Sequence, residues 1–210
     1  MKTLFVRRDG HARLLIYFHG WSMDETVLDP ASFPDGYDVL VCYDYRDLCA
    51  LPAGAEGYSS RVLVAWSLGV WAAARCRERF GMPELRRAIA VNGTLCPVSA
   101  EFGIDPAVFA GTAGHWLEPA ARQNFHRRTG GGPEPRRDPA EQRDELLALE
   151  AMIVASAPPA DFFDLALIGR RDRIFPAARQ QLFWGAKGRL LDWPHAHPGL
   201  AEVLAIAASL

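Results

Sequence analysis

Ser67 stands where an apolar run meets a helical pattern, a position in which a serine can act as a nucleophile. Residues 61–66 read RVLVAW, and apolar residues recur at helical spacing over 68–80. A nucleophile elbow sets its serine on a sharp strand-to-helix turn, with small residues two positions before and after it. Gly69 fits this pattern, and Ala65 replaces the usual first glycine. The alternative is that Ser67 only caps the N-terminus of the following helix.

A second turn, His19-Gly20-Trp21, follows the apolar run 14–18. In hydrolases with an elbow, such a turn supplies one backbone N–H of the oxyanion hole, and the residue after the nucleophile supplies the other. The predicted donors are therefore the amides of Trp21 and Leu68, and we expect the Trp21 ring to wall the substrate channel. The alternatives are a plain turn and a tryptophan packed in the core.

Asp172 follows the apolar run 164–169 in the segment RRDRIFP. An aspartate placed after this strand can orient the catalytic imidazole and stabilise its charged form. The competing interpretation is a solvated aspartate among three arginines.

Two histidines compete for the role of general base in the segment 194–198, PHAHP, after the last apolar run. His195 follows the strand end at the expected distance, so we favour it over His197. The base must come within hydrogen-bond reach of Ser67. The resulting chain order, Ser, Asp, His, is the order found in α/β-hydrolases.

The elements that must position these residues alternate along the chain. Short apolar runs at 14–18, 38–43, 61–66, 87–92, 164–169 and 189–193 predict strands that are covered on both faces. Helical patterns follow at 68–80, 177–184 and 198–210. This alternation predicts one α/β domain over residues 1–210, an α/β-hydrolase fold with a mostly parallel, doubly wound sheet.

The alternation breaks between about residues 97 and 160, where no strand-like run occurs. Gly130–Gly132 and the segment PEPRRDPAEQ indicate a surface loop, and 140–156 indicates a helix with one apolar face. A helical insertion between two strands of this fold is where a lid over the active site would lie.

Composition narrows the class of protein. A net charge of −2 favours neither nucleic acid nor a membrane surface as a partner, and no apolar stretch is long enough to span a bilayer. The N-terminus lacks the pattern of a signal peptide, and the four cysteines form no Cys-x-x-Cys pair. No metal-ligand or phosphate-loop motif occurs. We therefore expect a cytoplasmic monomer with reduced thiols, no metal and no cofactor.

Four segments together resemble one known family. VAWSLGVWAA, FHGWSMD, GRRDRIFPAARQQLFW and PHAHP are similar to BioG-type pimeloyl-acyl-carrier-protein methyl ester esterases of biotin synthesis. The resemblance covers roughly residues 4–200 and is weakest in the inserted segment, and an alanine in place of the first elbow glycine is typical of the family. Where the family usually has an aromatic residue and Pro-Phe after the catalytic histidine, this chain has Ala196 and His197.

The resemblance implies hydrolysis of the methyl ester at the end of a pimeloyl chain carried on acyl carrier protein. It assigns Ser67 as nucleophile, Asp172 as orienting acid and His195 as general acid and base, with Trp21 and Leu68 at the ester site. The apolar channel under the lid would pass Phe102, Phe109, Trp116 and Phe125.

The partner implied by the resemblance is an acidic carrier protein. Arg122, Arg127 and Arg128 would dock it, or else form an ordinary solvated helix face. Two rival hypotheses stay open: a general short-chain carboxylesterase or thioesterase, and a catalytically inactive binding protein with a hydrolase fold.

Overall fold

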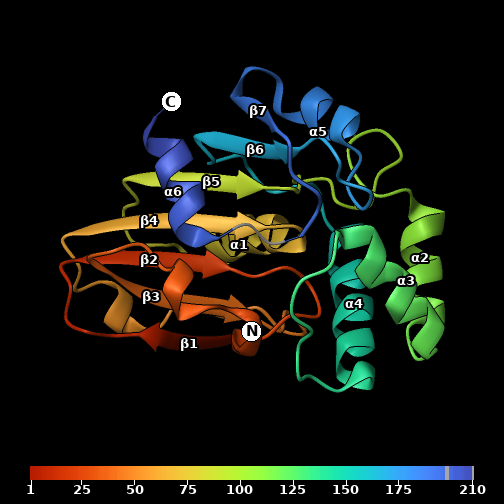
Figure 1. Cartoon of the computed structure of the whole chain (residues 1–210), viewed down its shortest axis with the longest axis horizontal. Coiled ribbons are helices and arrows are strands. Elements are labelled where there is room, and N and C mark those ends of the chain that lie inside the picture. Colours follow the sequence, from red (N-terminus) through yellow and green to blue (C-terminus); the bar gives the residue numbers. More distant parts are fainter. Residues whose placement is uncertain (197–198, 210) are drawn as a thin grey trace.

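One seven-stranded sheet forms the centre of the computed structural model, which describes residues 1–196 and 199–209 (Figure 1). The strands are β1 (Lys2–Arg7), β2 (Arg13–Phe18), β3 (Tyr37–Tyr43), β4 (Ser60–Trp66), β5 (Arg87–Val91), β6 (Leu165–Gly169) and β7 (Gly188–Leu191). They lie in the order β1-β3-β2-β4-β5-β6-β7. Every pairing is parallel except that of β1 with β3.

Helices cover both faces of this sheet. In β2, Leu14, Ile16 and Phe18 pack in the same apolar cluster as residues of α1 (Leu68–Phe80) and α5 (Ala177–Trp184). Leu15 and Tyr17 belong to the opposite cluster, which includes residues of α6 (Leu200–Ala208). Because successive side chains of a strand point to opposite faces, a strand covered on both sides must be apolar throughout. The prediction of a mostly parallel, doubly wound α/β-hydrolase sheet is confirmed.

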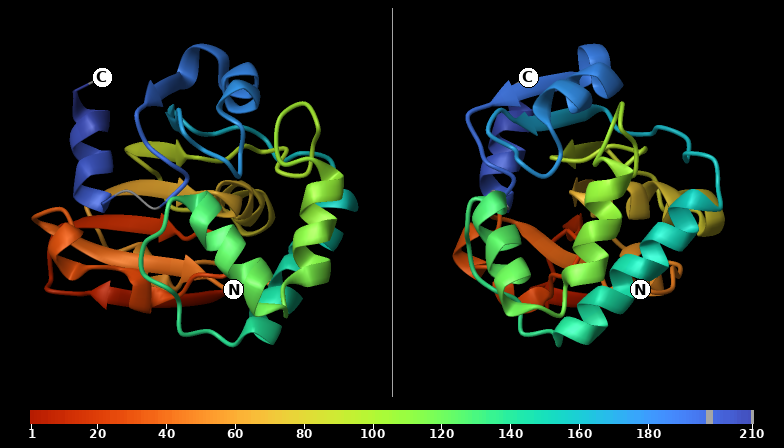
Figure 2. Two further views of the ribbon diagram at one scale, coloured as in Figure 1. Left: turned by 45° about the vertical axis from the view of Figure 1, so that its right-hand side comes forward. Right: turned by 90° about the vertical axis from the view of Figure 1, so that its right-hand side faces the viewer.

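Three further helices stand between β5 and β6 in the chain. They are α2 (Pro106–His115), α3 (Pro119–Thr129) and α4 (Pro139–Val154), and they lie side by side beyond the carboxyl ends of the parallel strands (Figures 1 and 2). Each begins with proline in its first turn, and the side chains of Asp105 and Asp138 cap α2 and α4. The helix expected at 140–156 is α4, whereas α2 and α3 carry no marked apolar stripe and were not foreseen.

Short 3₁₀ helices occupy several of the remaining connections: η1 (Glu25–Val27), η2 (Pro30–Ser32), η3 (Ala53–Ala55) and η4 (Gly185–Lys187). The edge strand β1 was also missed from the sequence. It has no fully buried residue, so it lacks the continuous apolar run that marks the inner strands. The last helix begins at Leu200, and Pro198, where it was expected to start, lies outside the described residues.

Candidate active site

The backbone at Ser67 has the shape of a nucleophile elbow. Ser67 has φ 58° and ψ −129° between β4 and α1, and its N–H donates to the carbonyl oxygen of Val91 at 2.9 Å. A non-glycine residue with positive φ is strained and persists only where surrounding structure holds it. The Ser67 side chain makes no capping hydrogen bond to α1, so the interpretation of Ser67 as a simple helix cap is wrong.

Glycines allow the backbone to close around this turn. A Cβ atom on Gly93 would lie 2.3 Å from the Ser67 carbonyl oxygen, and one on Gly69 would lie 2.4 Å from the His19 carbonyl oxygen. Both distances are too short for any side chain. Gly69 was singled out from the elbow pattern, while Gly93, in the loop after β5, was not.

The structure brings Ser67, His195 and Asp172 together. His195 Nε2 lies 3.0 Å from Ser67 Oγ, and His195 Nδ1 lies 2.9 Å from Asp172 Oδ2. Because an ionised carboxylate only accepts, Nδ1 carries the proton and Nε2 is left to accept the Ser67 hydroxyl proton. Both the imidazole and the carboxylate are almost completely buried. His197, the second candidate for the base, lies outside the described residues.

Asp172 is held by a complete set of donors. Its Oδ1 accepts from the backbone N–H groups of Ile174 and Phe175 at 2.8 and 2.9 Å, and its Oδ2 also accepts from Gln180 Nε2 at 3.1 Å. The Phe175 ring stacks on His195, with 9° between the ring planes. The interpretation of Asp172 as a solvated carboxylate is therefore wrong. Gln180 and Phe175 were not foreseen, because only the folded chain places them here.

The loop that carries His195 is fixed through its backbone. Asn92 Nδ2 donates to the carbonyl oxygens of Pro194 at 3.0 Å and His195 at 3.3 Å, and Asn92 Oδ1 accepts from the Gly169 N–H at 2.6 Å. Trp66 Nε1 donates to the same His195 carbonyl at 2.9 Å. Asn92 thus joins the ends of β5 and β6 to the histidine loop. In the sequence, its place at the end of the apolar run 87–92 was the only available signal.

An apolar cavity opens beside Ser67. It is lined by Trp21, Ser67, Leu68, Ile104, Val108, Phe109, Thr112, Phe125, Arg128, Leu146 and Ile174. The amides of Trp21 and Leu68 donate no hydrogen bond within residues 1–196 and 199–209, so both are available to a ligand.

The Trp21 ring packs against Trp116 and Phe125, with centroids 4.4 and 5.4 Å apart. Of the expected channel residues, Phe109 and Phe125 line the cavity, whereas Trp116 contacts the Trp21 ring and does not line the cavity. Phe102 packs on Phe183 instead.

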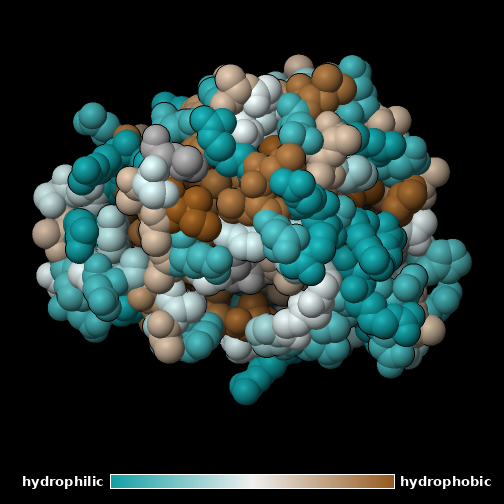
Figure 3. Space-filling model, turned by 45° about the horizontal axis from the view of Figure 1, so that its top comes forward, coloured by the Kyte–Doolittle hydropathy of each residue, from teal (hydrophilic) through white to brown (hydrophobic). Residues whose placement is uncertain are grey.

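The three arginines expected to meet a partner all lie on α3 but differ in exposure. Arg127 is exposed, whereas Arg122 and Arg128 are half-buried. Arg122 donates to the Trp116 carbonyl oxygen and Arg128 to the Arg173 carbonyl oxygen. Hydrophilic side chains gather on the side of the molecule where the inserted helices lie, and hydrophobic ones are visible near the middle of the same face (Figure 3).

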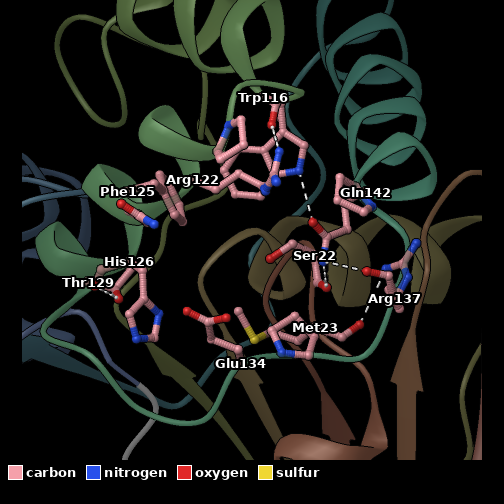
Figure 4. A pocket seen from close by; sticks show the side chains of 14 residues that line it. Ser22, Met23, Trp116, Arg122, Phe125, His126, Thr129, Glu134, Arg137 and Gln142 are labelled. Carbon is pink, nitrogen blue, oxygen red and sulfur yellow. Dashed lines mark hydrogen bonds between the residues drawn. The ribbon is translucent and has the colours of Figure 1, made fainter.

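A polar cavity adjoins the apolar one, and Phe125 lines both of them. Residues from α3, α4 and the loops beside them, including Ser22, Arg122, His126, Glu134 and Gln142, surround this second cavity (Figure 4). In the described part of the chain, no cluster of His, Cys, Asp and Glu is arranged to hold a metal ion, and no helix is long and apolar enough to cross a membrane.

Comparison with known proteins identifies the family. The family model described as pimeloyl-ACP methyl esterase BioG matches residues 1–198. The chain belongs to the BioG family. The resemblance inferred from its motifs is thereby confirmed.

A BioG structure from Haemophilus influenzae is similar over nearly the whole chain. Its TM-score is 0.81 and its sequence identity 33%, and the match covers 93% of this chain and 94% of the other. An esterase from Exiguobacterium antarcticum has the same fold, with a TM-score of 0.62 at 11% identity over 99% of this chain and 90% of the other. The family description supports a hydrolase.

Two curated relatives also match. An uncharacterised protein of Haemophilus influenzae is 36% identical over 89% of this chain and 88% of its own length. A Bacteroides fragilis protein named malonyl-[acyl-carrier protein] O-methyltransferase is 37% identical over 81% of this chain. The matched region makes up only 36% of that longer protein.

Proposed function

We propose that this BioG-family protein is a serine carboxylesterase that hydrolyses the methyl ester of pimeloyl-acyl carrier protein. One observation carries the proposal: a buried Asp172–His195–Ser67 relay reaches an apolar cavity that also contains two candidate oxyanion donors. The family description supports the substrate.

The proposed reaction uses each of these groups in turn. Ser67 Oγ attacks the ester carbonyl while His195 Nε2 takes its proton, and the N–H groups of Trp21 and Leu68 stabilise the oxyanion. His195 then protonates the departing methoxide, which leaves as methanol. Water attacks the acyl-enzyme with His195 again acting as base, and the products are a free carboxylate and regenerated Ser67.

A substrate with a bulky carrier at its far end needs a path from Ser67 to the surface. Val108 lines the cavity and is 42% exposed, so the cavity reaches the surface at α2. Val108, Thr112, Phe125 and Arg128 also line a surface hollow between α2 and α3. The acyl chain would leave the site there, close to the proposed docking arginines.

Complementation tests the biological substrate. Expression in a biotin-requiring strain that lacks its own esterase is expected to restore growth without biotin, and Ser67→Ala is expected not to. In the purified protein, methanol release from the carrier-bound methyl ester should be faster than hydrolysis of simple aryl esters. Equal or lower activity on the carrier-bound ester, together with failure to complement, would favour a general esterase or thioesterase.

Labelling separates catalysis from the non-catalytic alternative. A fluorophosphonate probe is expected to label the wild type and not Ser67→Ala. Absence of labelling in the folded wild type would favour a binding protein without hydrolase activity.

Carrier docking requires a test of its own. Arg127→Glu is expected to raise KM for the carrier-bound ester and to leave KM for a small aryl ester unchanged. Arg79→Glu, at the exposed end of α1, is the matched control. Equal KM values for the wild type and Arg127→Glu on the carrier-bound ester would contradict the docking role.

The methyltransferase name of the Bacteroides relative is not carried to this chain. That name belongs to a protein of which the matched region is 36%. An enzyme that forms a methyl ester and one that removes it act on the same class of bond, so the name is compatible with the esterase proposal.

A further inference from the structure

The turn that carries the Trp21 amide is held in place by residues from a distant part of the chain. Ser22, directly after Trp21, has φ 71° and is almost completely buried. A serine in this backbone region is strained, so neighbouring groups must hold it there. Its position matters for the proposed reaction, because the adjacent Trp21 N–H must stay aimed at the developing oxyanion.

The groups that hold this turn come from the inserted helix α4. Gln142 Nε2 donates to the Ser22 carbonyl oxygen at 3.3 Å (Figure 4). The Gln142 carbonyl oxygen accepts from Trp21 Nε1 at 2.6 Å. One turn further along the helix, Glu145 Oε2 accepts from the Ser22 N–H at 3.3 Å. Two residues of α4 thus contact the N–H and the carbonyl oxygen of Ser22, which belong to the peptide groups before and after its Cα atom.

Glu145 is an unusual residue for this task, because its side chain is completely buried. Its carboxylate accepts from Arg137 Nη1 at 2.5 Å and from the backbone N–H of Tyr45, at the end of β3, at 2.9 Å. Arg137 also donates to the Met23 carbonyl at 3.3 Å and lies 3.3 Å from Asp44.

Burial raises the pKa of Glu145, and it outweighs Arg137 and the Tyr45 N–H, which act in the opposite direction. A buried ion pair is costly, and an apolar pair of similar volume is often as stable. Stability alone therefore gives little reason for a carboxylate here.

We infer that Glu145 is a positioning residue for the oxyanion site, and this inference rests on the proposed esterase function. Its carboxylate, paired with Arg137, fixes the peptide group between Trp21 and Ser22 and so fixes the direction of the Trp21 N–H. Helix α4 is then a fixed part of the active site and does not move as a lid.

Glu145→Gln tests the inference with little change in volume. A glutamine has one acceptor oxygen for the amides of Ser22 and Tyr45, and its NH₂ group must face one of these donors. Loss of one oxyanion donor costs on the order of 10²–10³ in rate, so partial misdirection should lower kcat on an aryl ester by about 10- to 100-fold. KM should change by less than about threefold, because the groups that hold the ground state are untouched.

A pair of inhibitors distinguishes misdirection of the Trp21 N–H from a general loss of order in the active site. A trifluoromethyl ketone adds to Ser67 and forms an oxyanion, whereas the matching alcohol binds in the same cavity and forms none. Glu145→Gln should weaken binding of the ketone by the same factor as kcat and leave binding of the alcohol unchanged. Equal weakening of both compounds, or unchanged kcat in a folded variant, would overturn the inference.

Two further variants complete the test. Asp144→Asn changes the exposed neighbouring acid on the same helix and should behave as the wild type. Gln142→Leu removes the amide that donates to Ser22 and keeps the carboxylate of Glu145. It should lower kcat and ketone affinity in parallel, which tests whether the Ser22 turn directs the Trp21 N–H even if Glu145→Gln does not fold; unchanged values would overturn that premise. A wild type inactive on every ester would instead refute the proposed function itself.

Discussion

Replacing Asp172 by asparagine is the most direct test of the relay, because the structure dictates how the new side chain must lie. Oδ1 of Asp172 faces the backbone N–H groups of Ile174 and Phe175, and Oδ2 faces Gln180 and His195. The two backbone N–H groups are fixed in direction and can only donate. The single oxygen of asparagine must therefore stay with them, and its NH₂ group must replace Oδ2.

The NH₂ group would then point at His195 Nδ1. To avoid two facing donors, the imidazole must carry its proton on Nε2, which lies 3.0 Å from Ser67 Oγ. In this tautomer Nε2 donates and cannot take the serine proton. The equivalent change in a serine protease leaves the geometry intact and lowers kcat by about 10⁴-fold. We expect a similar loss here, which corresponds to about 5 kcal/mol of transition-state stabilisation.

The assay is hydrolysis of a soluble aryl ester, with circular dichroism and thermal unfolding to show that the variant is folded. Asp192→Asn is the matched control, since the Asp192 side chain is 80% exposed and its ion-pair partner Arg171 is 62% exposed. A folded Asp172→Asn that keeps more than a tenth of wild-type kcat would refute the assignment of the tautomer and of the orienting acid.

Further predictions concern the glycines and Asn92. Gly93→Ala should lower both stability and kcat, because its Cβ would lie 2.3 Å from the Ser67 carbonyl oxygen. Gly111 in α2 has open space around it, so Gly111→Ala should instead raise the free energy of unfolding in urea by about 0.5–1 kcal/mol. Asn92→Ala should cost about 2–4 kcal/mol of unfolding free energy, since it leaves buried backbone groups unpaired, and unchanged stability would contradict this.

For Asp44, desolvation would raise the pKa, but the Arg46 hydrogen bond and the Arg137 charge lower it from 3.8 to about 2. Because the folded-state pKa lies below the unfolded one, Asp44→Asn should be less stable than the wild type at pH 7. The difference should shrink as pH falls from about 4 towards 2, and a difference that grows on acidification would contradict it.

Much of the fold and the relay could be predicted because the signals are local. Ser67, Asp172 and the His195 loop each follow the end of an apolar strand, and carboxyl ends of parallel strands meet at one edge of a sheet. Local spacing was therefore enough to propose which side chains converge.

The residues that hold the catalytic side chains in place had no such local signal in the sequence. Asn92 and Gln180 matter because they contact groups 103 and 8 positions away along the chain, which neither spacing nor composition encodes. The edge strand β1 was missed for a related reason: half-covered strands need fewer apolar residues, so their pattern is weak.

Helix α4 shows why the inserted segment was the hardest part to interpret. In the sequence, Glu145 stands in a run of charges, DPAEQRDELLALE, that suggests the solvated face of an amphipathic helix. In the structure the same carboxylate is buried, because its donors on Ser22 and Tyr45 come from the ends of β2 and β3, 123 and 100 residues away. If α4 moved aside, the buried carboxylate of Glu145 would lose its hydrogen bonds to the backbone N–H groups of Ser22 and Tyr45. Access to Ser67 must therefore depend on α2 and α3, whose residues Val108 and Phe125 line the cavity at its surface opening.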